Sequence, residues 1–149
     1  MIHVQAASER LLLAPASQTN SQTRTANIDC AGATYATIRM NFASELNTNA
    51  VGPVIQLLQS DDTVVTNFAT FNADFNSAEL DLTAAKSLTY HLDLRGRKRY
   101  LRLSVTTPTA TNDNVTMGAG ATLSRKSQEP ASEANMAGTT NDVVVVAGL

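Results

Sequence analysis

The sequence predicts an all-β fold, an antiparallel β-sandwich that is jelly-roll-like and has extended N- and C-terminal arms. Apolar residues alternate with polar ones in several short segments, and turn-forming clusters separate these segments about every ten residues. No long helical period interrupts the pattern. Two sheets that each have one apolar face are stabilised when those faces pack together. The length of 149 residues favours a jelly roll over an immunoglobulin-like sandwich, and the chain lacks the tryptophan and the cysteine pair of the latter.

The composition gives this fold a largely uncharged polar surface. Hydrophobic residues make up 43% of the chain and charged residues 16%, whereas about 25% of an average soluble domain is charged. The polar residues include 19 Thr, 12 Asn and 11 Ser, which suit strands and turns. A net charge of −2 argues against binding to nucleic acid or to an anionic membrane, because both need a broad basic surface.

We expect one folded domain between two arms. The predicted segments are an N-terminal segment and polar arm over residues 1–27, a β-sandwich domain over 28–124, and a C-terminal arm over 125–149 that ends in an apolar strand. Cys30 is the single cysteine, so no disulfide can form within the chain. Pro15 and a polar stretch follow the short apolar run 11–13, which is therefore too short for a secretory signal or a membrane span.

Alternation predicts strands in the first half of the domain. In residues 35–42 every second residue is apolar, which predicts a strand with one buried face. Residues 54–59 and 64–71 predict a hairpin around the turn 60–63. Residues 14–27 show no apolar period, so we expect an arm or a loop there. Residues 72–87 fit a short helix and a strand equally well.

Residues 88–94 and 99–105 predict a second hairpin across a four-residue loop. In this register Leu92 lies opposite Leu101, and all of the paired apolar residues share one face. A shift of one residue would turn the apolar side chains of one strand toward solvent. The alternation therefore predicts the register as well as the strands.

The last two predicted strands have unusual compositions. Residues 115–123 contain Gly118 and Gly120, which indicate close packing against a neighbour or a bulge. The chain then ends in a run of valines, Val143, Val144, Val145 and Val146. Four consecutive valines place apolar side chains on both faces of a strand, so they need cover on both sides. We expect this run to be a contact within a homo-oligomer, where it adds a strand to a neighbouring subunit or packs along a symmetry axis.

The sequence carries no pattern typical of catalysis or metal binding. His3 lies near the N-terminus, and His91 is expected on the polar face of a strand, opposite Arg102. The chain has no nucleophile elbow, no P-loop and no zincin motif. Asp61 and Asp62 are ordinary turn residues. We therefore expect a protein that is not an enzyme and has no catalytic residue, no metal and no cofactor.

The one cluster of charge is cationic. Five of the eleven basic residues lie within eight positions, and these are Arg95, Arg97, Lys98, Arg99 and Arg102. Like charges this close repel one another, so they need an external anion or carboxylates from elsewhere in the chain. Acidic groups on a protein partner would bind such arginines with geometric specificity. Nucleic acid and plain solvation are the competing interpretations, although only Tyr100 is present to stack on bases.

The stretch YHLDLRGRKRYLRLSVT resembles a strand pair in the small head-decoration, or cement, proteins of tailed bacteriophages. The stretches GATYATIRMNF, VIQLLQSDDT and LSRKSQEP resemble the same family, so that the resemblance covers most of residues 32–130. It implies a jelly-roll-like virion protein that binds outside the lattice of the major capsid protein and stabilises the head. We expect a homo-oligomer, a trimer rather than a dimer, located on the capsid surface after synthesis in the host cytoplasm.

Two other functions are compatible with a β-sandwich. A carbohydrate-binding module usually rests sugars on exposed aromatic rings, but this chain has no tryptophan, three tyrosines and four phenylalanines. A glycoside hydrolase would need a pair of carboxylates whose separation in space the sequence does not reveal. The prediction is therefore a decoration protein, with the cationic cluster contacting the capsid or a neighbouring subunit and a carbohydrate-binding module as the alternative.

Overall fold

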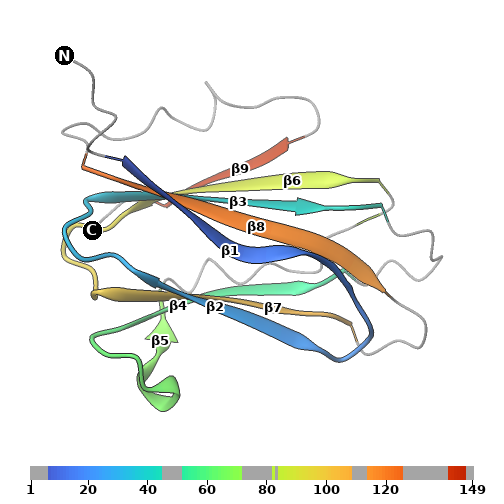
Figure 1. Ribbon diagram of the computed structural model, residues 1–149, viewed down its shortest axis with the longest axis horizontal. Coiled ribbons are helices and arrows are strands. Elements are labelled where there is room, and N and C mark those ends of the chain that lie inside the picture. The colour runs from blue at the N-terminus through green and yellow to red at the C-terminus, as the bar shows by residue number, and fades with distance from the viewer. Residues whose placement is uncertain are drawn as a thin grey trace.

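The computed structural model describes residues 7–44, 52–71, 82, 84–108 and 114–125, and the backbone of Asn141–Val146. In these residues nine strands form two sheets that pack face to face (Figure 1). The five-stranded sheet has the order β1-β8-β3-β6-β9 and the four-stranded sheet has the order β2-β7-β4-β5. The strands are β1 (Ala7–Gln18), β2 (Thr23–Asp29), β3 (Tyr35–Phe42), β4 (Val54–Ser60), β5 (Ala69–Thr70), β6 (Lys86–Asp93), β7 (Tyr100–Thr106), β8 (Val115–Ser124) and β9 (Asn141–Val146).

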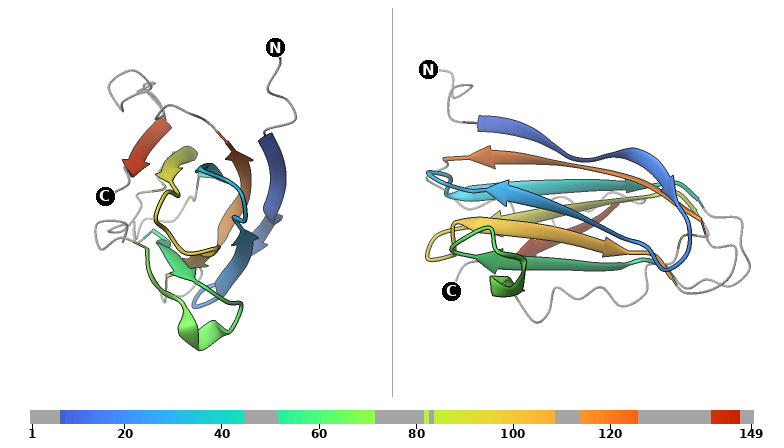
Figure 2. Two further views of the ribbon diagram at one scale, coloured as in Figure 1. Left: turned by 90° about the vertical axis from the view of Figure 1, so that its left-hand side faces the viewer. Right: turned by 60° about the horizontal axis from the view of Figure 1, so that its bottom comes forward.

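The strand order is that of a jelly roll. Strands far apart in the sequence are neighbours, since β1 pairs with β8, β2 with β7 and β3 with β6, all antiparallel. Successive strands from β1 to β4 alternate between the sheets, and the two layers are seen end-on in Figure 2. The predicted fold class, an all-β jelly-roll-like sandwich, is confirmed. β9 is an addition to this plan, and it joins β6 in parallel.

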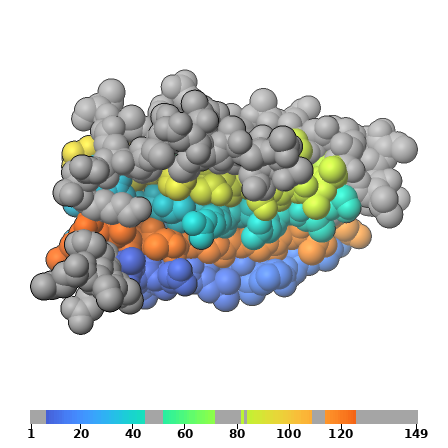
Figure 3. Space-filling model, turned by 90° about the horizontal axis from the view of Figure 1, so that it is seen from above, coloured from blue at the N-terminus to red at the C-terminus, as the bar shows by residue number. Residues whose placement is uncertain are grey.

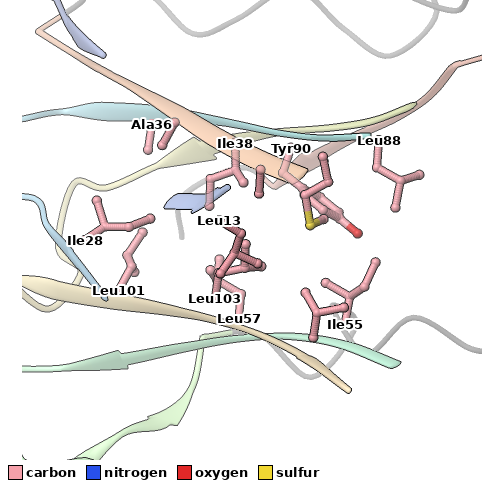
Figure 4. Packing of buried hydrophobic residues seen from close by; sticks show 14 of the residues in the cluster. Leu13, Ile28, Ala36, Ile38, Ile55, Leu57, Leu88, Tyr90, Leu101 and Leu103 are labelled. Atoms are coloured by element: carbon pink, nitrogen blue, oxygen red, sulfur yellow. The ribbon is translucent and has the colours of Figure 1, made fainter. Parts of the chain in front are cut away.

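The core lies between the two sheets (Figure 4). β3 shows how the sequence builds it, because the alternate residues Ala36, Ile38, Met40 and Phe42 are each at most 3% exposed. The alternation predicted for residues 35–42 is therefore confirmed. From the opposite sheet, Leu57, Leu101 and Leu103 are also almost fully buried. Each such side chain contributes about 1.5–3 kcal/mol of hydrophobic stabilisation relative to an exposed one.

The prediction of an arm or loop over residues 14–27 is wrong. Ala7–Gln18 and Thr23–Asp29 form β1 and β2, which are edge strands of the two sheets, and only residues 19–22 form a turn between them. Edge strands need few apolar residues, and in β1 only Leu13 and Gln18 are buried. Register shifts on either side of Leu13 also break the alternation along β1. A bulged edge strand therefore lacks the period by which strands are recognised in a sequence.

The predicted hairpin of residues 88–94 and 99–105 is also wrong, although both strands exist. β6 pairs with β3 and β9, whereas β7 pairs with β2 and β4 in the other sheet. Leu92 and Leu101 both enter the core, but from opposite layers. Alternation identifies the apolar face of a strand and does not identify its neighbour. Consequently His91 lies opposite Thr37 and not opposite Arg102.

The antiparallel pair predicted over residues 54–71 is confirmed, but residues 61–68 join its strands and not the predicted turn 60–63. β4 and β5 pair antiparallel through Leu58 with Thr70 and Gln59 with Ala69. The second strand is shorter than expected, because Val65–Asn67 forms a 3-10 turn. Most of the ambiguous stretch 72–87 lies outside the described residues, and its last two residues begin β6.

Of the two alternatives predicted for Gly118 and Gly120, close packing against a neighbour is confirmed. A Cβ atom on Gly118 would lie 3.1 Å from Cγ of Pro15, so β1 packs closely over this part of β8. The register shifts between Leu11 and Leu13 and between Leu13 and Ala16 lie in β1, whereas β8 itself pairs with β3 without a shift.

Candidate functional site

The cationic cluster lies at one end of the sandwich, where the loop 94–99 links the two sheets. This end faces the viewer in the left panel of Figure 2. We call it the cationic end and define it by Arg95, Arg97, Lys98, Arg99 and Arg102. The loop is tied to the neighbouring loop 30–34, because the N–H of Leu94 donates to the carbonyl of Thr34 (2.9 Å) and the N–H of Cys30 donates to the carbonyl of Arg99 (2.9 Å).

Arg99 forms a bidentate ion pair with Asp29, the last residue of β2. Nε donates to Oδ1 at 2.9 Å and Nη2 donates to Oδ2 at 2.7 Å. These bonds and the one from the N–H of Ala31 lower the pKa of Asp29 to about 2. The Arg99 guanidinium also stacks near the Tyr100 ring, 4.9 Å from its centroid. Arg99 is therefore held on two sides while its side chain remains 54% exposed.

Arg95 is held in a similar way by Asp93, the last residue of β6. Asp93 is 3% exposed and accepts hydrogen bonds from the backbone N–H of Arg95 (2.9 Å) and from its guanidinium. The guanidinium carbon lies 5.4 Å from the centroid of the Tyr35 ring. Burying a carboxylate is unfavourable unless a charged group pairs with it. The ion pair with Asp93 therefore holds the Arg95 side chain in place, although this side chain is 54% exposed.

Lys98 contacts the loop that follows β4. Its ammonium group lies 3.0 Å from a carboxylate oxygen of Asp61. The adjacent Asp62 orders this loop, accepting hydrogen bonds from Nδ2 of Asn67 (2.8 Å) and from the N–H of Val64 (2.9 Å). The Asn67 bond, followed by the Val64 bond, lowers the pKa of Asp62. The predicted turn chemistry of this aspartate pair agrees with these contacts.

Arg97 and Arg102 rest on aromatic rings. The Arg97 guanidinium lies 4.5 Å from the centroid of Phe71 and donates to the Phe71 carbonyl at 3.4 Å. Arg102 lies 4.1 Å from the centroid of Phe68 and donates from Nε to Oδ1 of Asn27 at 2.8 Å. Arg102 is only 8% exposed, which leaves it little surface for an external partner.

The cluster therefore finds carboxylates within the chain, one of the two possibilities that the sequence left open. Asp29, Asp61 and Asp93 come from three separate strand ends that the jelly roll brings together. Sequence reasoning missed all three, and it also missed the supporting rings of Tyr35, Phe68 and Phe71. Only Asp93 is close enough in sequence to Arg95 to have been found without the fold.

The predicted oligomer contact lies at the far edge of the five-stranded sheet. The backbone of β9 pairs in parallel with β6, from Ser87 opposite Asn141 to Leu92 opposite Val146. The structure thus places the residues Val143, Val144, Val145 and Val146 on an edge strand of their own chain. Their contact with another subunit stays a prediction.

A shallow groove runs over the outer face of the five-stranded sheet, the face seen in Figure 3. Two hollows of about 330 and 420 Å³ meet there at Leu11 and Gly120. Leu11 is 75% exposed. Glu9 and Arg39 line one hollow, and Pro15 lines the other.

Groups with catalytic potential are few in the part of the chain that the structure describes. His91 interacts through Nδ1 with Oγ1 of Thr37 at 3.1 Å. Cys30 is buried, and burial raises the pKa of its thiol to about 12, so it remains an unreactive thiol. No three His, Cys, Asp or Glu side chains among the described residues are close enough to hold a metal ion. His3 lies outside the described residues.

Comparison with known proteins does not assign the chain to a family. No protein-family model matches it, and no curated protein shows significant similarity to it. Among the described residues, no helix has the length and apolar character required to cross a membrane.

Proposed function

We propose that this chain is a structural virion protein that binds the outside of a bacteriophage capsid and stabilises the head. The observation that carries the proposal is the cationic end. There, arginine side chains are held in fixed positions on the exposed end of a jelly roll. The resemblance to head-decoration proteins supports the same function.

Fixed side chains favour binding to another protein. Arg95 and Arg99 are each 54% exposed, yet a carboxylate and an aromatic ring restrain both of them. Ordering a free arginine at an interface costs about 0.5–1.5 kcal/mol, and a restrained arginine loses less on binding. Asp29 uses two of the five N–H donors of Arg99, so the guanidinium has donors for a second acceptor.

Arg97 is the best candidate for direct contact with an acidic group of the capsid. Its described partners are a ring and a carbonyl of Phe71, neither of which neutralises its charge. Arg95, Lys98 and Arg99 are partly neutralised by aspartates. Arg102 is buried, so its role in this proposal is to support Phe68 and not to touch the partner.

The proposed partner is the major capsid protein, and the proposed state on the capsid surface is a homo-oligomer, a trimer rather than a dimer. Symmetric oligomers match the local symmetry of a shell lattice. The valine strand β9 provides the contact between subunits in this proposal. No enzymatic activity, metal or cofactor is part of it.

Co-sedimentation with shells assembled from the major capsid protein of the same genome tests the proposal. We expect saturable binding that weakens as salt rises, since the Debye length falls from about 10 Å at 0.1 M to about 3 Å at 1 M. Arg97→Glu should weaken binding roughly tenfold or more, because a like charge placed against an acidic patch costs several kcal/mol. The described side-chain contacts of Arg97 are all with Phe71 in the loop region, and no core residue rests on them, so the fold should persist.

Arg39→Glu is the matched control, because it makes the same charge change on the outer face of the five-stranded sheet. It should leave shell binding near the native level. Equal loss with Arg97→Glu and Arg39→Glu would mean that only net charge matters, and binding that does not saturate would contradict a decoration site.

The alternative, carbohydrate binding, would use the groove on the outer face. Thr37, Thr122, Arg39 and Glu9 offer polar groups there. Phe42, the aromatic residue that lines the groove, is 3% exposed and points into the core cluster. The described lining therefore offers no exposed ring for a sugar, and specific binding on a glycan array would reverse the ranking of the two functions.

A further inference from the structure

β9 is an extra strand on a fold that is complete without it. β1 to β8 already form both four-stranded layers of the jelly roll, in the orders β1-β8-β3-β6 and β2-β7-β4-β5. β9 extends the first layer at the outer edge of β6. It is the one strand that pairs in parallel among those described, as Figure 1 allows the reader to follow.

The edge of β6 is therefore an acceptor for an extended strand in a defined register. Six residues of β6, from Ser87 to Leu92, lie opposite the six residues of β9. On its other side β6 is paired with β3 over its full length. Leu88, Tyr90 and Leu92 anchor β6 in the core. A long strand with an open edge binds another strand readily, so this edge has to be covered by some segment.

The segment that covers the β6 edge can come from the same chain or from another copy of it. β8 and β6 both run antiparallel to β3 and hence run in the same direction. Because β9 runs parallel to β6, β8 ends at one end of the sheet and β9 begins at the other. Residues 126–140 could span up to about 50 Å at 3.3–3.6 Å per residue. This length joins β8 to the β6 edge of the same chain, and it is long enough for β9 to be placed on another copy instead.

We propose that in the oligomer β9 of each chain pairs with β6 of a neighbouring copy, in the register seen within one chain. The inference rests on the proposed oligomeric function. Exchange keeps every backbone pairing and costs little free energy, because the contacts are identical. Donation from each chain to the next closes a ring, which suits a trimer.

A disulfide trap between two differently tagged chains tests the exchange. One chain carries Thr89→Cys and the other carries Val143→Cys, at positions that lie opposite each other in the register. The two chains are expressed together, purified and oxidised. Exchange predicts a covalent dimer of the two tags in at least half of the mixed oligomers. Cys30 can remain in place, because its buried thiol is unreactive, and Cys30→Ala provides a second background if it cross-links.

Three results would overturn the proposal. One is the absence of a mixed dimer while a single chain with both Thr89→Cys and Val143→Cys closes its disulfide internally. Another is a homodimer of Val143→Cys chains, which would show that the open edges of two β9 strands meet. The third is a yield that stays unchanged when Val144→Cys, one position out of register, replaces Val143→Cys. Shell binding is not part of this readout, so its failure would leave the proposed function standing.

Discussion

At the residue scale, the charges of the cationic end are organised by partners from distant parts of the chain. Asp29 and Arg99 are 70 residues apart in sequence and form the two-pronged pair at the end of the sandwich. The sequence shows that Arg95, Arg97 and Arg99 are crowded, and the general need for carboxylates follows from that crowding. Which carboxylates meet them depends on strand pairing, and alternation carries no information on that.

The ion pair of Asp29 and Arg99 predicts an acid-dependent contribution to stability. The pKa of Asp29 is lowered from 3.8 to about 2 in the folded protein, mainly by the hydrogen bonds from Arg99. A carboxyl with a lowered folded pKa contributes stability that is fully present above the unfolded pKa and is lost as the pH falls through the folded pKa. Asp29→Asn should therefore lower the urea midpoint at pH 5 to 6, and the difference from the native chain should shrink below pH 4 and vanish only below pH 2.

NMR titration of the Asp29 carboxyl measures the same quantity directly. Its midpoint should lie near pH 2 in the native chain and should move toward 3.8 in Arg99→Gln, which removes the charge and the fork of donors. A native midpoint close to 3.8 would show that the pair does not persist in solution. The stability argument at this end of the molecule would then be wrong.

At the scale of elements, alternation predicted correctly the strands that pair with a neighbouring strand on each side in the sheet. β3 and β8 lie inside the five-stranded sheet, and their alternate residues are buried as the pattern requires. β1 and β2 lie at sheet edges, carry Thr, Ser and Asn, and were not recognised. The failure has a physical cause, since an edge strand is held by backbone pairing on one side and needs few buried side chains.

β6 and β7 show a second limit of sequence reasoning. Their apolar faces were identified correctly, but the two strands belong to opposite sheets and do not pair with each other. Both arrangements bury the same leucines, so the hydrophobic pattern cannot separate them. The loop between them was consequently placed at a hairpin tip, whereas it links the two layers and brings Arg99 to Asp29.

The assignment of β1 as a structural strand predicts unequal effects for two leucines two positions apart. Leu13 is 4% exposed and belongs to the core, whereas Leu11 is 75% exposed. Leu13→Ala should lower the free energy of unfolding by about 2–4 kcal/mol, because it leaves a cavity between the sheets. Leu11→Ala should change it by no more than about 0.5 kcal/mol. Urea denaturation of the two variants measures both values, and equal small effects would restore the interpretation of this segment as an arm.

At the scale of the whole molecule, the jelly roll brings charged residues that are far apart in the sequence together on one surface. Residues from the ends of β2, β6 and β7 meet at the cationic end. The fold class could be predicted from strand spacing and composition because two amphipathic sheets have few ways to bury their faces. The partner could not be predicted from physics in the same way, because a surface records the charge of its ligand but not the ligand's identity.

In the proposed function, binding of this chain stabilises a capsid, and the thermal rupture of DNA-filled heads measures that stabilisation. Heads that lack the protein are incubated with increasing amounts of it and heated, and DNA release is followed with a dye. We predict that the rupture temperature rises with the number of bound chains and stops rising when the sites are full. Heads that carry a full complement of the protein and still rupture at the temperature of bare heads would contradict the account.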